Sequence, residues 1–245
     1  MTGICIVTGA SRGIGAAVAR LLAANDYAVC VNYRNQREPA ERLAAEIESS
    51  GGRAIAVAAD VARQRDVERL FETVDERLGP LTALVNNAGI HGPRARVDEL
   101  AMSAVEEVLD VNVVGLISCS QQAVRRMSTR HGGAGGAIVN ISSGAAHIGQ
   151  PGGGVQYAVS KGAVNSFTIG LSQEVAGEGI RVNAVSPGLT RTDMPDPGYL
   201  ERGPAIIPMG RVGEPEEIAE AVLWLLSTRA SFVAGANIRV AGGRP

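Results

Sequence analysis

Short, strongly apolar runs alternate with amphipathic segments along the whole chain, and this alternation constrains the fold more than any other feature. The run 3–8 (GICIVT) is almost entirely apolar, and residues 13–24 after it place apolar side chains at helical spacing. Strands that alternate with helices of this length form a parallel sheet covered on both faces. We therefore predict an α/β fold with a doubly wound parallel sheet. The predicted strands are 3–8, 28–33, 53–58, 81–86, 137–141, 180–185 and 237–240, and the predicted helices are 13–24, 38–50, 64–78, about 102–129, 155–176 and 214–227.

One connection breaks this rhythm. Residues 188–213 join a predicted strand to a predicted helix and contain four prolines. A connection of this length inside a compact domain is usually functional, commonly a loop that covers a substrate. We predict that role here; the alternative is a passive surface insertion. Because 245 residues suit one α/β domain and no linker or repeat interrupts them, we treat 1–245 as a single domain.

Composition excludes several classes of protein. The chain has a formal net charge of -2 and 3% aromatic residues, so we expect no nucleic-acid partner. No apolar run approaches the roughly 18 residues that span a bilayer, and no secretory leader is apparent, so we expect no membrane contact and a cytoplasmic location. The three cysteines and three histidines are scattered, which predicts buried, reduced thiols and no metal site.

The first predicted strand leads directly into a glycine-rich turn, Thr8–Gly15 (TGASRGIG). Gly9, Gly13 and Gly15 lie at a strand-to-helix turn, where the pyrophosphate of a dinucleotide meets a helix N-terminus. The spacing is GxxxGxG rather than GxGxxG, and the Gly-Lys-Ser/Thr ending of a triphosphate-binding loop is missing. The turn therefore predicts a dinucleotide site of a Rossmann-like fold.

The end of the second predicted strand indicates which dinucleotide binds. In an NAD site an acidic residue here holds the adenine ribose hydroxyls. Tyr33 takes that place, and Arg34 follows it. A guanidinium suits a 2′-phosphate, and Arg12 in the glycine turn lies where it can reach the same group. Each arginine alone reads as a solvated surface charge; together, and without the acid, they favour NADP.

A tyrosine and a lysine four residues apart predict an acid–base catalyst. Tyr157 and Lys161 share one face of a predicted helix, and Lys161 is the only lysine of the chain. A neighbouring ammonium lowers the pKa of a tyrosine, which is a poor base otherwise. The alternative is that the lone lysine reflects only a composition biased towards arginine. Ser143 follows the strand 137–141 at the edge where ligands of such sheets bind, and Asn112 interrupts an apolar helical stripe.

Taken together, these residues resemble the short-chain dehydrogenase/reductase family, including its 3-oxoacyl-thioester reductases and glucose-1-dehydrogenase-like members. The matches follow the family's order and cover nearly the whole chain. They are Thr8–Gly15, Asp60-Val61, Asn86-Asn87-Ala88-Gly89, Asn112, Ser143, Tyr157-Ala-Val-Ser-Lys161, Asn183, and Pro187-Gly188 with Thr192.

The resemblance implies a role for each matching residue. Tyr157 would exchange a proton with the substrate oxygen, Lys161 would lower its pKa and hold the nicotinamide ribose, and Ser143 would orient the substrate. Asn112 would support a water relay from Lys161. The implied cofactor-binding residues are Gly9, Ser11, Arg12, Gly13, Ile14, Gly15, Tyr33, Arg34, Asp60, Val61, Asn87, Ala88, Gly89, Tyr157, Lys161, Pro187, Gly188, Thr190 and Thr192. The family also implies a homotetramer.

Two positions depart from the family's pattern. Ser143 and Tyr157 are 14 positions apart, one more than in the most similar reductases, and Ala241 stands where an aspartate is frequent. The predicted activity is hydride transfer between NADPH and a carbonyl or secondary alcohol. A 3-oxoacyl-thioester substrate and a sugar or polyol remain open, with a weak preference for glucose-dehydrogenase-like members. A non-catalytic NADP(H)-binding sensor is the alternative outside enzymes.

Overall fold

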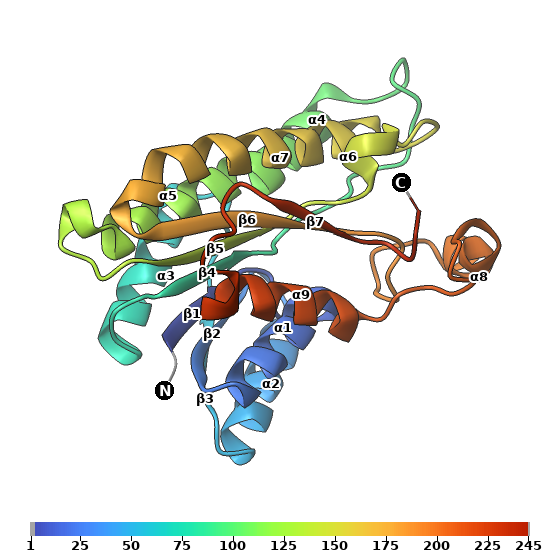
Figure 1. The fold of residues 1–245 in the computed structure, drawn as a ribbon. Helices are drawn as coiled ribbons and strands as arrows, with labels where there is room; N and C mark the ends of the chain where they lie inside the picture. The colour runs from blue at the N-terminus through green and yellow to red at the C-terminus, as the bar shows by residue number, and fades with distance from the viewer. Residues whose placement is uncertain (1–2, 245) are drawn as a thin grey trace.

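A computed structural model describes residues 3–244, and its seven strands form one parallel sheet in the order β3-β2-β1-β4-β5-β6-β7 (Figure 1). The strands are β1 (Gly3–Val7), β2 (Tyr27–Tyr33), β3 (Arg53–Ala58), β4 (Ala83–Asn86), β5 (Gly136–Ile141), β6 (Ile180–Pro187) and β7 (Asn237–Val240). The predicted doubly wound, Rossmann-like sheet is confirmed.

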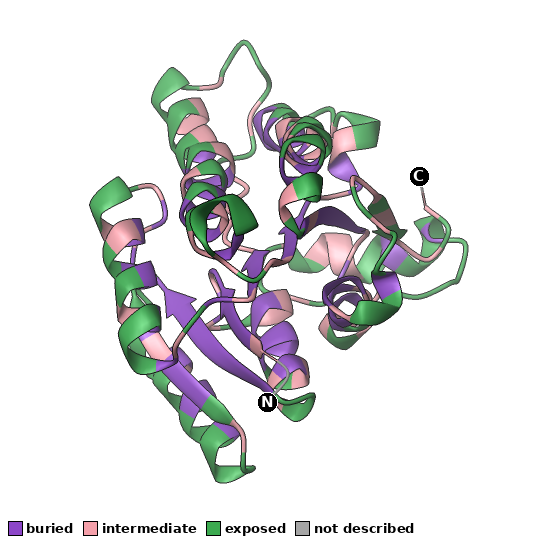
Figure 2. Cartoon of the chain, turned by 60° about the vertical axis from the view of Figure 1, so that its left-hand side comes forward, coloured by how far each residue is buried: buried purple, intermediate pink, exposed green. Residues whose placement is uncertain are grey.

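Helices cover both faces of the sheet. On one face lie α1 (Gly13–Ala24), α2 (Arg37–Ser49) and α9 (Pro215–Leu226); on the other lie α3 (Gln64–Arg77), α5 (Gly115–Met127) and α7 (Val155–Val175). The strands between them are largely buried (Figure 2). Burial on both faces explains why the strands read as continuous apolar runs rather than as alternating ones.

The prediction of one regular helix over about 102–129 is wrong. The structure has α4 (Met102–Leu109), a π-helical turn at Asp110–Val114, and then α5; a short 3₁₀ turn, Thr129–His131, follows. The π turn contains Asn112, whose amide is turned inward and bonds to the backbone of Ile90. Single π turns inside α-helices are frequent at functional sites.

The connection 188–213 is not structureless, because it contains the helix α8 (Pro197–Ile206). Its two ends are joined at the base. Thr190 forms a bridge with Gly213, the Arg191 N–H donates to the Gly213 carbonyl at 2.9 Å, and the Gly213 N–H donates to the Leu189 carbonyl at 3.0 Å. The two ends of the segment 188–213 therefore lie side by side where it leaves β6 and where it leads into α9. The remaining short helix, α6 (Ala145–Ile148), precedes α7.

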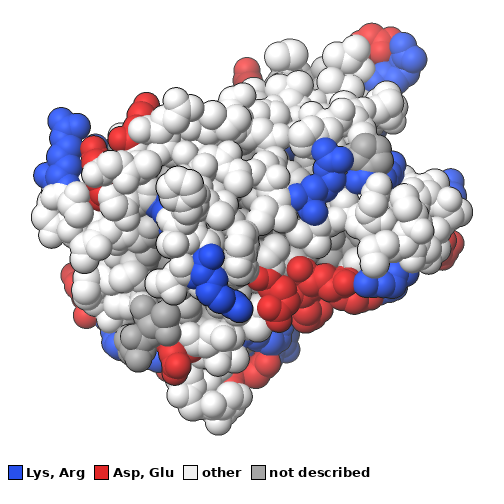
Figure 3. Space-filling model, in the orientation of Figure 1, with Lys and Arg blue, Asp and Glu red and all other residues white. Residues whose placement is uncertain are grey.

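Other expectations concern the surface and the thiols. Cys5, Cys30 and Cys119 are free and buried, as predicted. None of the described helices is long and apolar enough to cross a membrane. On the face shown in Figure 3, acidic side chains gather over α9, whose first turn carries Glu216 and Glu217, and the basic side chains are dispersed.

The strand order reverses between β1 and β4, which are neighbours in the sheet although β2 and β3 separate them in sequence. At such a switch point the loops after the two strands diverge and leave a crevice at the carboxyl edge. The glycine turn follows β1, and residues 87–89 follow β4. The fold therefore brings both motifs to the same crevice.

Candidate active site

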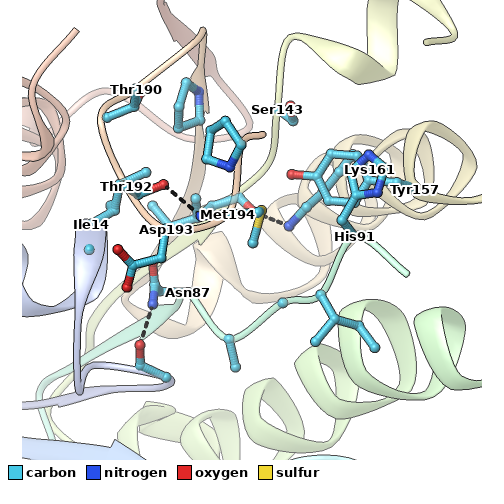
Figure 4. A pocket seen from close by; sticks show the side chains of 18 of the residues that line it. Ile14, Asn87, His91, Ser143, Tyr157, Lys161, Thr190, Thr192, Asp193 and Met194 are labelled. Atoms are coloured by element: carbon cyan, nitrogen blue, oxygen red, sulfur yellow. Dashed lines mark hydrogen bonds between the residues drawn. The ribbon is translucent and has the colours of Figure 1, made fainter. Parts of the chain in front are cut away.

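A cleft of about 510 Å³ lies at the carboxyl ends of the strands (Figure 4). The loops after β1, β2, β3, β4, β5 and β6 all contribute to its lining. Of the residues that the sequence predicted for the site, all line the cleft except Gly15 and Asn112, which lie behind it. The fold thus brings residues from six separate motifs to one place.

The glycines let the turn after β1 lie directly against the segment after β4. Gly9 has φ +61°, and a Cβ on it would lie 2.9 Å from the Ala88 Cα. A Cβ on Gly15 would lie 2.5 Å from the Asn87 Nδ2, whose N–H groups donate to the Thr8 and Gly9 carbonyls. Gly15 therefore serves close packing rather than contact with a ligand.

The N-terminus of α1 opens into the cleft, where the N-cap residue Arg12 pairs with the Asp193 carboxylate. No side chain caps this helix, and its first turn holds no acidic residue. Its first N–H groups and the positive end of its dipole favour an anion. The residues here fit a pyrophosphate.

Arg34, which follows β2 and lines the cleft, is exposed and forms no ion pair within residues 3–244. Arg12 pairs with Asp193 at 3.3 Å, with both side chains well exposed. An exposed pair of this kind stabilises by no more than about 1 kcal/mol, so Arg12 can exchange it for another anion. Asp60 accepts the Ala62 N–H at 3.1 Å and lies across from Arg34 in the same lining.

Tyr157 and Lys161 lie one helical turn apart on α7, and Ser143 follows β5. The Lys161 Nζ donates to the Ile141 carbonyl at 2.7 Å and lies 5.7 Å from the centre of the Tyr157 ring. Lys161 is only 4% exposed. Burial lowers the pKa of Lys161 to about 8, since a buried ammonium loses its hydration.

The pKa of Tyr157 reflects its burial and its contact with Ser143. Burial raises the pKa of Tyr157, and a hydrogen bond with Ser143 acts in the opposite direction. The lowering of this pKa by the Lys161 ammonium stays a prediction.

Asn112 is buried and its amide is satisfied. Its Oδ1 accepts the Ile90 N–H at 2.8 Å, and its Nδ2 donates to the Ile90 carbonyl at 2.9 Å and to the Ser160 hydroxyl at 3.0 Å. It does not bond directly to Lys161. A Cβ on Gly89 would nevertheless lie 3.3 Å from the Asn112 Oδ1 and 3.5 Å from the Lys161 Nζ, so both atoms border the same small space.

Several lining residues were missed from the sequence. Asn32 accepts the Gly9 N–H at 3.1 Å and donates to the Ala59 carbonyl at 3.1 Å, which ties the glycine turn to the end of β3. His91 lies against the Tyr157 ring, although scattered histidines suggested only the lack of a metal site. The other missed residues include Arg94, Gln150, Met194, Tyr199 and Arg244. No sequence signal marks them, because they meet only through tertiary contacts. Within the described residues, no group of three or more His, Cys, Asp and Glu side chains is placed to hold a metal.

Comparison with known proteins identifies the family. A short-chain dehydrogenase from Burkholderia cenocepacia J2315, solved in complex with NADP, has a TM-score of 0.91 and 35% identity, over 98% of this chain and 96% of that one. A family model described as enoyl-(acyl carrier protein) reductase matches residues 9–244. The chain belongs to the short-chain dehydrogenase/reductase family.

This short-chain dehydrogenase/reductase has relatives of more than one description. It is 46% identical to the uncharacterized oxidoreductase YgfF of Escherichia coli (strain K12), over 98% of this chain and 99% of the relative. It is 37% identical to glucose 1-dehydrogenase 2 of Bacillus subtilis (strain 168), over 97% of this chain and 93% of the relative. The resemblance read from the sequence is confirmed, and the protein is an oxidoreductase.

Proposed function

We propose that this protein is an NADP-dependent oxidoreductase that transfers hydride between NADPH and a carbonyl or secondary alcohol substrate. One observation carries the proposal: Ser143, Tyr157 and Lys161 line the same cleft as the glycine turn after β1. A hydroxyl that can move a proton next to a dinucleotide cradle is the arrangement that hydride transfer to a carbonyl needs.

The cleft fits NADP(H). The first turn of α1, which carries no acidic residue and no side-chain cap, suits the pyrophosphate. Arg34, free of ion pairs within residues 3–244, would hold the 2′-phosphate, with Arg12 beside it. The bound NADP in the Burkholderia relative supports the same choice. The proposed contacts are those implied by the family, with Asp60 and Val61 at the adenine, Asn87–Gly89 along the cofactor, and Pro187–Thr192 at the carboxamide.

When bound, NADPH supplies the hydride. The Tyr157 hydroxyl would give its proton to the substrate oxygen, and burial, which raises its pKa, keeps that proton in place beforehand. Ser143 would hold the same oxygen. Lys161 donates one N–H to the Ile141 carbonyl, and its other N–H groups would donate to the nicotinamide ribose. The space beside Gly89, bordered by Asn112 and Lys161, would take a water that returns a proton.

The test is the Tyr157→Phe variant, measured through the absorbance of reduced nicotinamide over a panel of ketones, 3-oxoacyl thioesters and sugars. Turnover should fall by about 10²-fold or more, the scale of general acid–base catalysis. NADPH affinity should barely change, because the substitution removes one oxygen from a packed ring. Turnover within a few-fold of the parent would refute the assignment of Tyr157.

The same panel separates the alternatives. A 3-oxoacyl-thioester reductase agrees with the name of a Staphylococcus aureus (strain Mu50 / ATCC 700699) relative, 3-oxoacyl-[acyl-carrier-protein] reductase FabG, which is 38% identical over 99% of this chain and 98% of the relative. A sugar or polyol dehydrogenase agrees with the Bacillus relative. A non-catalytic sensor would bind NADPH, detected by thermal shift, and turn over no compound. The presence of Ser143, Tyr157 and Lys161 in one cleft favours an enzyme, because a sensor has no use for proton transfer.

Two further expectations belong to this proposal. The segment 188–213 would cover the substrate, since Leu189, Met194 and Tyr199 line the cleft. The chain would act as a single unit in a cytoplasmic homotetramer. An exposed apolar surface on the α5–α7 side supports assembly, with Ile117 at 41%, Val159 at 58% and Ile169 at 51% exposure. Light scattering of the purified protein measures the mass of the assembly.

A further inference from the structure

His91, which follows β4, lies flat against the ring of Tyr157 (Figure 4). The two ring centres are 5.0 Å apart, and the planes are inclined by 27°. This is within the range of favourable aromatic pairs. One face of the phenol is therefore covered by an imidazole rather than by water.

Both nitrogens of this imidazole have partners. Nδ1 lies 3.1 Å from the Gly92 carbonyl oxygen, and Nε2 lies 3.0 Å from the Gln150 Nε2. A carbonyl oxygen only accepts, so Nδ1 carries the hydrogen. The Gln150 amide nitrogen only donates, so the His91 Nε2 is a bare acceptor. The two contacts together fit an imidazole with a hydrogen on Nδ1.

The backbone at His91 is tied to the helix that carries Tyr157. Gln156, in the first turn of α7, donates to the His91 carbonyl at 3.3 Å and to the Pro93 carbonyl at 2.8 Å. The histidine backbone and the tyrosine are thus held by the same helix end.

Gln150 maintains its contact with His91 under local strain. Its φ is +45°, and the only other described non-glycine residue with positive φ is Asp26. Its side chain packs over Gly154, where an added Cβ would lie 2.5 Å from the Gln150 Cδ. Its Oε1 is buried without a partner. Backbone strain and unpaired buried polar atoms concentrate at functional sites.

We propose that His91 is a positioning residue for Tyr157, held against the ring by Gly92 and Gln150 so that the phenol keeps one orientation with a face shielded from water. The inference rests on the proposed function, because it gives Tyr157 the proton transfer that His91 would serve. It also explains the inserted position before Tyr157: the loop 149–154 delivers the Gln150 amide to the imidazole.

The first experiment measures the pKa of Tyr157 in the absence of substrate. The absorbance of tyrosinate is followed against pH in the parent and in each variant, and again after Tyr157→Phe is added to each. The difference between the two curves gives the ionisation of Tyr157 alone. In His91→Ala the phenol face opens to water, so Tyr157 should ionise at lower pH than in the parent, because desolvation is what raises its pKa. Lys161, 5.7 Å from the ring, and Ser143 are unchanged in every protein. His147→Ala, an exposed histidine on α6, is the matched control and should titrate as the parent does.

The second experiment uses Gln150→Asn, which guards against a folding defect. Asparagine tolerates positive φ better than glutamine and keeps the amide, but it is one methylene too short to reach His91. We expect kcat to fall about tenfold with the KM for substrate and the NADPH affinity little changed, since a misplaced catalytic group costs rate rather than binding. Unchanged kcat and an unchanged Tyr157 titration in both variants would overturn the inference. If Tyr157→Phe itself keeps full turnover, the proposed function fails instead.

Discussion

Lys161→Met should abolish activity and yet stabilise the fold at neutral pH. Lys161 is buried without a carboxylate partner among its hydrogen bonds and ion pairs, and burial lowers its pKa to about 8 from the ordinary value of 10.5. A lowered folded-state pKa means that the ammonium is less stable in the folded than in the unfolded chain. The unfolded chain therefore binds more protons between these two pKa values, so stability rises with pH across that window.

The size of the stabilisation follows from the pKa shift of Lys161. The difference between 10.5 and about 8 means that the buried ammonium destabilises the folded state by about 3 kcal/mol, at 1.36 kcal/mol per pKa unit. The substitution also removes the hydrogen bond from Lys161 to the Ile141 carbonyl, which reduces the stabilisation by about 1 kcal/mol. Methionine fills a similar volume without the charge. We expect a net stabilisation of about 2 kcal/mol near neutral pH, as the difference of these two terms.

The assay is urea unfolding of the parent and of Lys161→Met at several pH values. The gain should be full below a pH of about 8. As the pH passes 10.5, the parent lysine is neutral in both states, and only the lost bond to Ile141 remains, so the variant should become less stable than the parent by about 1 kcal/mol. Other titrating groups, such as the buried thiols, are common to both proteins and cancel in the difference. A constant difference across this range, or a loss of stability near neutral pH, would refute the reasoning.

Three further predictions concern the cleft. Lys161→Arg should stay nearly inactive, because a planar guanidinium cannot replace a compact ammonium in a buried site; recovery of parental turnover would mean that the lone lysine has no special role. Arg34→Ala should weaken NADPH binding by about 1.5–3 kcal/mol and leave NADH little affected, and adding Arg12→Ala should enlarge the loss. Titration of both nucleotides checks this, and equal losses for the two would contradict it. Gly15→Ala should destabilise by about 1–3 kcal/mol, since its Cβ would lie 2.5 Å from the Asn87 Nδ2; an unchanged thermal midpoint would show that the segment yields without cost.

The sheet and the part of the cleft at the glycine turn were predictable because their signals are local. The apolar runs mark strands buried on both faces, and the glycines of Thr8–Gly15 mark a turn where the backbone approaches a neighbouring segment. The strand order then places the motifs together, since parallel strands end at one edge. Gly15 shows the limit of this reasoning: the motif was recognised, but its packing against Asn87 rather than a ligand is visible only in the structure.

Other features had signals that were overlooked or had none. The helix α8 begins with Pro197, and Asp196 accepts the Gly198 N–H, so a cap followed by proline at the first helical position was present in the sequence. The π turn at Asn112 had no such signal, because its partner Ile90 is 22 positions away and no helical pattern encodes that contact. The stacking of His91 on Tyr157 is likewise a product of tertiary structure.

The bridge between Thr190 and Gly213 has a consequence for how such proteins diverge. Because backbone hydrogen bonds join residues 189–191 to Gly213, substitutions at the exposed positions of 194–206 leave the register of β6 and the start of α9 unchanged. Mutations there change the wall of the cleft that Met194 and Tyr199 line, while the glycine turn, Ser143 and Tyr157 stay in place. The shape of this wall can therefore drift independently of the rest of the cleft.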